Sequence, residues 1–107
     1  MSIAHQDLAN GRWFELSLAE QLGNVGSEYE RAVKWKESND ARFESAVNRF
    51  LELLDLTIGN QRLAAAQRRE LVRVREAVCE ELGEKVKHDD YFQRYFFYFA
   101  LAARNRK

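Results

Sequence analysis

The chain has 107 residues, of which 46% are hydrophobic and 32% charged, and its 17 lysines and arginines balance 17 aspartates and glutamates. This length predicts a single domain over residues 1–107, with enough apolar residues to build a core. The neutral charge balance does not favour nucleic-acid binding through a general basic field, and the absence of proline favours helices over a turn-rich β-fold.

The first half of the chain predicts an arm followed by two long helices. Residues 1–11 form the arm or a short helix, and Asn10-Gly11 is a break. A helix is expected from Trp13 to Lys36, and a second from Ala41 to Ile58. Gly23 and Gly26 lie inside the first helix, where they allow either a close approach of another helix or a slight bend.

The second half predicts two more helices. One extends from Gln61 to Leu82, and Gly59 before it is expected in the left-handed conformation that ends helices. The last begins at Tyr91, after two aspartates, and ends in a basic run. Short links between four helices favour antiparallel neighbours, so the predicted fold is all-α, an up-down-up-down antiparallel four-helix bundle.

The last helix is the most aromatic part of the chain. Its apolar arc is roughly 260° wide, whereas an ordinary surface helix has an apolar stripe of about 100°. A terminal helix of a short chain is not covered on all sides by its own neighbours, so the pattern predicts a homo-oligomer or a contact with another protein. The alternative is that the rings cover one another. The expected interface residues are Tyr91, Tyr95, Phe96, Phe97, Tyr98, Leu101 and, on the second helix, Leu56.

Four polar residues interrupt the predicted apolar faces: Gln21, Glu28, Asp55 and Arg75. A buried arginine requires a carboxylate, so Arg75 is expected to pair with Glu28 or Asp55. Two interpretations are open. The residues form a small polar site inside the bundle, or they form a network of ion pairs and amides that fixes helix register.

Known catalytic and metal-binding patterns are not found, so no catalytic residue, metal or cofactor is predicted. Glu52-x-x-Asp55 resembles half of the metal site of all-α nucleotide pyrophosphohydrolases, but Arg31 stands where that family needs another carboxylate. The lone Cys79 excludes an internal disulfide framework and is expected to be packed. With no signal peptide and no span of membrane length, the chain is predicted to be cytoplasmic and not a membrane protein.

The runs Leu51–Thr57, Arg73–Glu76 and Tyr95–Arg104 resemble a group of small uncharacterised prokaryotic proteins. At the level of architecture the predicted bundle is similar to the 23S rRNA intervening-sequence proteins and to the accessory protein of diversity-generating retroelements. That resemblance implies homo-oligomeric bundles and, for the retroelement protein, nucleic-acid binding through a basic surface. Arg68 and Arg69 on the third helix are the candidate phosphate contacts.

The leading hypothesis is therefore a non-enzymatic module that self-associates through its last helix. The second is a nucleic-acid-associated accessory protein that binds through the third helix. The third is a magnesium-dependent hydrolase at Glu52 and Asp55.

Overall fold

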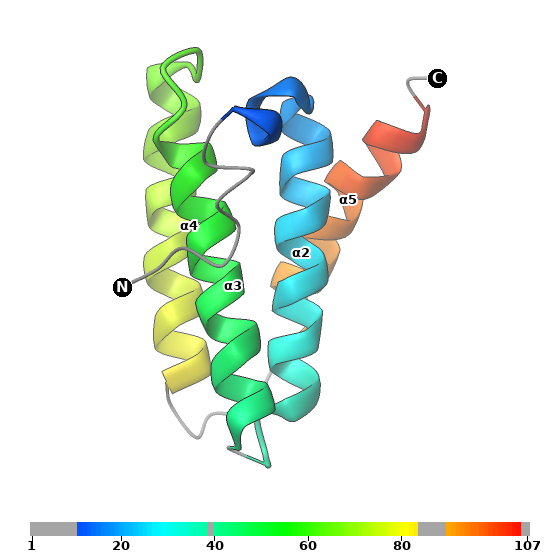
Figure 1. Cartoon of the computed structure of the whole chain (residues 1–107), viewed down its shortest axis with the longest axis vertical. Helices are drawn as coiled ribbons and strands as arrows, with labels where there is room; N and C mark the ends of the chain where they lie inside the picture. Colours follow the sequence, from blue (N-terminus) through cyan, green and yellow to red (C-terminus); the bar gives the residue numbers. More distant parts are fainter. Residues whose placement is uncertain (1–10, 39, 84–89, 106–107) are drawn as a thin grey trace.

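The computed structural model of the protein describes residues 11–38, 40–83 and 90–105 and shows an all-α bundle (Figure 1). These residues form a 3₁₀ helix, η1 (Arg12–Glu15), and the α-helices α2 (Leu18–Trp35), α3 (Ala41–Ile58), α4 (Ala65–Gly83) and α5 (Tyr91–Asn105). Successive α-helices alternate in direction, which confirms the predicted up-down-up-down order (Figure 1). The arm predicted for residues 1–11 lies outside the described residues except for Gly11, whose φ of 123° fits the predicted break.

The first predicted helix was placed too early, because the chain breaks after η1. Leu16 is extended, and Ser17 is the N-cap of α2. The Ser17 hydroxyl accepts from the Glu20 N–H at 3.1 Å, and the Glu20 carboxylate accepts from the Ser17 N–H at 2.9 Å. This reciprocal capping box was present in the sequence as Ser17-Leu-Ala-Glu20 and starts the helix at Leu18.

Helix α2 is the central element of the bundle, since it packs extensively against both α3 and α5. The middle of its apolar stripe, from Leu22 to Ala32, is buried, and the largest side chains of the core come from α2, α3, α5 and η1. Helix α4 lies beside α3 at the edge of the bundle, and α5 leans away from the other helices toward its C-terminal end (Figure 1). The core therefore follows α2 and α3, and consists of Trp13, Leu22, Val25, Tyr29, Ala32, Ala46, Phe50, Leu53, Leu54, Leu63, Leu71, Val74, Val78, Leu82 and Phe96.

The α2–α3 connection is fixed by local polar and aromatic contacts. The Asp40 carboxylate caps α3 by accepting from the Arg42 N–H at 2.9 Å. The same carboxylate accepts from the Arg42 guanidinium, at 2.6 Å and 3.2 Å. This guanidinium lies 3.7 Å from the centre of the Trp35 ring. The Arg42 guanidinium, stacked on the Trp35 ring, thus joins the first turn of α3 to the last residue of α2.

The glycine expected to end the second helix behaves differently from the prediction. Helix α3 has the predicted limits, but Gly59 has φ −77° and is not left-handed. Its N–H instead donates to the Asp55 carbonyl at 2.9 Å, as in a continuing helical turn. Helix α4 then begins at Ala65 rather than Gln61, after a turn in which the Asn60 side chain accepts from the Arg62 N–H.

Glycines in α2 allow α5 to approach closely, which confirms one of the two predicted roles. A Cβ on Gly23 would lie 3.1 Å from the Ala100 Cα, and a Cβ on Gly26 would overlap the Cβ of Phe96. The groove formed by these two glycines therefore receives Phe96 and Ala100 of α5. Each glycine costs an isolated helix roughly 1 kcal/mol relative to alanine, and at these two positions the missing side chain makes room for α5.

We expect Gly26→Ala to destabilise the protein although alanine is the better helix former. The overlap falls on the Cβ of Phe96, which cannot rotate away, so α5 must shift; overpacking of this kind costs about 1–3 kcal/mol. Gly83→Ala is the matched control, because no atom of the described residues lies within 4 Å of a Cβ at Gly83. Urea denaturation of both variants gives the comparison. Equal stability of Gly26→Ala and wild type would contradict the close α2–α5 contact.

Candidate interaction surfaces

Helix α5 has one face inside the core. Phe96 is 2% exposed, and its ring centroid lies 5.7 Å from that of Tyr29 and 5.9 Å from that of Phe50. Phe92 and Phe99 are partly buried against the same core. The prediction that Phe96 belongs to an intermolecular interface is therefore wrong, because this ring is covered within the chain and anchors α5 to α2.

The opposite face of α5 exposes large aromatic side chains. Tyr91 is 58% exposed, Phe97 53% and Tyr98 67%, and Leu101 is half-buried. We call these four residues the α5 outer face. The charged residues of α5 are both arginines, Arg94 and Arg104, so the surface is aromatic and basic. Exposed apolar area concentrated on one helix is typical of a contact surface.

The two remaining residues of the predicted interface have other surroundings. Tyr95 is partly buried, and its hydroxyl donates to the Glu70 carboxylate of α4 at 2.7 Å. Burial, and then this hydrogen bond, raise the pKa of Tyr95 above the usual tyrosine range. Tyr95 thus links α5 to α4. Leu56 on α3 is partly buried against the core rather than exposed.

The four polar residues do not form one network. Arg75 pairs with Asp55, as one of the two predicted pairings proposed, with Nε–Oδ1 at 2.7 Å and Nη2–Oδ2 at 3.2 Å. These side chains are 36% and 52% exposed, so the pair lies at the surface. The Asp55 carboxylate also raises the Arg75 pKa. Glu28 lies apart from them, 3.4 Å from the Arg31 guanidinium. The prediction of one buried network is wrong.

Gln21 belongs to a different buried polar cluster at the η1 end of the bundle. Its side-chain amide donates to the carbonyls of Trp13 and Leu16, at 3.1 Å and 3.2 Å. The Trp13 indole N–H donates to the Thr57 hydroxyl at 3.0 Å, and that hydroxyl donates to the Leu53 carbonyl. This cluster holds η1 on α3. The sequence analysis missed this cluster because neither Trp13 nor Thr57 was among the four polar residues expected on the apolar faces.

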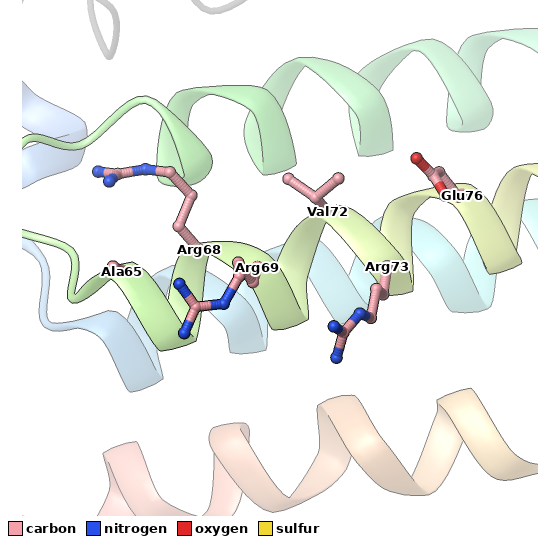
Figure 2. Close-up of a pocket in the computed structure, with 6 residues that line it drawn as sticks. All are labelled: Ala65, Arg68, Arg69, Val72, Arg73 and Glu76. Carbon is pink, nitrogen blue, oxygen red and sulfur yellow. The ribbon is translucent and has the colours of Figure 1, made fainter.

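The two candidate phosphate-binding arginines have different roles. The Arg68 guanidinium donates to the Ile58 carbonyl at 2.9 Å and to the Asn60 carbonyl at 2.6 Å. It therefore satisfies carbonyls at the C-terminal end of α3. Arg69 and Arg73 are exposed and line a shallow pocket of about 460 Å³ on α4, in which their side chains point away from that of Arg68 (Figure 2).

The candidate chemistry of the carboxylates and the thiol is limited by their surroundings. Both oxygens of Asp55 accept from Arg75, so the Glu52-x-x-Asp55 pair is not an open metal site. Among the described residues, no group of three or more His, Cys, Asp or Glu side chains is placed to hold a metal ion.

Cys79 is exposed, contrary to the expectation of a packed thiol, and lines a groove between α3 and α4. No described helix has the length and hydropathy needed to cross a bilayer.

Comparisons with protein-family models, curated proteins and solved structures give no match for this chain. The resemblances stated from the sequence therefore stay predictions, and the surfaces described above carry the functional argument.

Replacing Arg68 and Arg69 separately should distinguish a structural cation from a surface cation. Arg68→Ala removes the donors to Ile58 and Asn60, so we expect the free energy of unfolding to fall by about 1–2 kcal/mol. Arg69→Ala removes the same charge from an exposed position, and its effect should stay within about 0.5 kcal/mol. Chemical denaturation of the two variants provides the test. Equal effects would contradict the assignment of Arg68 to the end of α3.

Proposed function

We propose that the protein is a non-enzymatic interaction module that self-associates through the α5 outer face. The observation that carries the proposal is the exposure of Phe97 and Tyr98, each more than half accessible on the most aromatic helix of the chain. Aromatic side chains dominate the cores of protein interfaces because they bury large areas at a small cost in conformational entropy. Among the described residues, this face holds three of the four exposed large hydrophobic side chains.

Contacts between the rings of α5 do not remove this exposure. Tyr91 packs edge-on against Phe92, and Tyr95 against Phe96 and Phe99, with centroids between 5.0 Å and 5.4 Å apart. These pairs are the contacts expected if the aromatic rings of α5 cover one another within the chain. They leave Phe97 and Tyr98 in contact with solvent, so intrahelical packing explains only part of the aromatic content.

A second copy of the chain is the partner that the composition of this face favours. An apolar face is complementary to itself, so two copies related by a two-fold axis can cover each other's exposed rings. Guanidinium groups such as those of Arg94 and Arg104 can stack on the tyrosine rings of a partner, and Arg94 also pairs with Asp90 at 3.4 Å, so two such helices repel each other little. Binding that depends on apolar burial should persist at high salt.

The second hypothesis, a nucleic-acid accessory protein, loses one of its two predicted contacts. Arg68 is held by backbone carbonyls, which leaves Arg69 and Arg73 as the exposed cations that line the shallow pocket on α4 and form no ion pair with another described residue. Glu76 lines the same pocket and would repel a phosphate backbone. Self-association through α5 is therefore the better supported function.

Light scattering should detect this self-association. We expect wild type at 0.5 M salt to exceed the monomer mass of 12.6 kDa, and Phe97→Glu with Tyr98→Glu to be a folded monomer. Both side chains are more than half exposed, so their replacement leaves the core intact. Ser45→Glu with Asn48→Glu adds the same charge to an exposed part of α3 and is the control. A monomeric wild type, or an assembly that persists in the α5 variant, would contradict the proposal.

A further inference from the structure

Besides the α5 outer face, the molecule has a second exposed helical face. It lies on α4, on the side opposite the buried residues of that helix. Leu71, Val74 and Val78 point into the core, and the residues about half a turn away from them are exposed. We call this exposed stripe the α4 outer face, and it consists of Arg69, Val72, Arg73, Glu76 and Glu80. Val72 is 38% exposed, and four of the five members of the stripe also line the pocket in Figure 2.

Two pairs of like charges lie on the α4 outer face, although Arg73 and Glu76, three residues apart, have a favourable spacing. Arg69 and Arg73 are four residues apart, as are Glu76 and Glu80, so each pair places like charges on adjacent turns. None of the four forms an ion pair within 4.0 Å with another described residue. Arg75 on the same helix does find a carboxylate on a neighbouring helix. The four charged side chains of the α4 outer face are therefore exposed and accessible to the charges of a partner.

The same pattern is complementary to itself when two α4 helices lie antiparallel. In one register, Arg69 of each copy faces Glu80 of the other and Arg73 faces Glu76, because both pairs are centred between residues 74 and 75. Relative to the middle of the face, Arg69 and Glu80 deviate by about 10° and Arg73 and Glu76 by about 30°, each pair to opposite sides, and these long side chains can bridge the offsets across a two-fold axis. A two-fold axis doubles each contact and gives four ion pairs.

We propose that the α4 outer face binds the same face of a second copy of this chain, antiparallel and in this register. The proposal rests on charge complementarity and does not depend on self-association through α5. The glutamates of the stripe distinguish this partner from nucleic acid, because they attract the partner's arginines and would repel phosphates. The stripe offers little apolar area and exposed ion pairs are individually weak, so the contact should be weak and sensitive to salt.

Charge reversal tests the register directly. The full chain carrying Phe97→Glu and Tyr98→Glu serves as background, so that any contact through α5 is removed. At about 20 mM salt, sedimentation equilibrium on this background should show a dimer that Arg69→Glu with Arg73→Glu weakens at least about tenfold. Glu76→Arg with Glu80→Arg should weaken it equally. An equimolar mixture of these two variants should associate, and the chain carrying all four reversals should recover its own dimer.

The control is Arg49→Glu with Arg62→Glu, which changes the net charge equally at exposed positions outside the α4 outer face. This control should dimerise as the background does, and circular dichroism should show that every variant is folded. Absence of a low-salt dimer in the background, or failure of the mixture and of the fourfold reversal to associate, would overturn the proposal. RNA retardation abolished by Arg69→Glu with Arg73→Glu, without a dimer, would also overturn it in favour of a nucleic-acid surface. These outcomes are independent of the high-salt assembly that tests α5.

Discussion

The close contact between α2 and α5 determines how this chain distributes its aromatic residues. Gly23 and Gly26 remove side chains from one face of α2, and α5 approaches until Phe96 and Ala100 occupy the space. Phe96 then completes an aromatic cluster with Tyr29 and Phe50, which joins α5 to both α2 and α3. Without this contact α5 would be held mainly by the hydrogen bond from Tyr95 to Glu70.

The geometry of that contact also explains why the outer side of α5 stays accessible. A helix anchored along one narrow groove buries the residues that enter the groove, and its other face is covered only if further helices reach it. Here α5 leans away from the other helices, and Tyr91, Phe97 and Tyr98 remain exposed (Figure 1). An all-round apolar helix in a small bundle therefore yields one anchoring face and one exposed face. If α4 also pairs between copies, the two surfaces together would give assemblies larger than a dimer.

The sequence was sufficient to predict the fold class and the limits of α3. Amphipathic periodicity and the absence of proline determine helix formation from residues that are near one another in the sequence. It also predicted that Arg75 would pair with Glu28 or Asp55, since a charged residue beside an apolar stripe needs a nearby partner, and the structure shows the pair with Asp55. The burial of that pair was overestimated because α4 lies at the edge of the bundle. Periodicity defines a stripe, but the depth of its burial depends on how closely neighbouring helices pack.

The exposed surfaces of α4 and α5 were predicted less completely than the fold, because their exposure also depends on how closely the neighbouring helices pack. The arc of α5 suggested an interface, but which residues point inward was decided by the glycines of α2, so Phe96 was misplaced. Arg68 and Arg69 are adjacent in sequence and look equivalent, yet a rotation of about 100° directs the first to α3 and the second to solvent. The break before Ser17 was readable from its capping box and was overlooked.

The two faces of α5 give the most direct test of this account. Hydroxyl-radical footprinting of the wild type, read residue by residue in dilute and concentrated solution at high salt, reports side-chain accessibility along the helix. The account predicts that Phe96 stays unreactive at both concentrations, whereas Phe97 and Tyr98 react in dilute solution and become protected on concentration. Reactivity of Phe96 equal to that of Phe97, or no protection of Phe97 and Tyr98 on concentration, would contradict it.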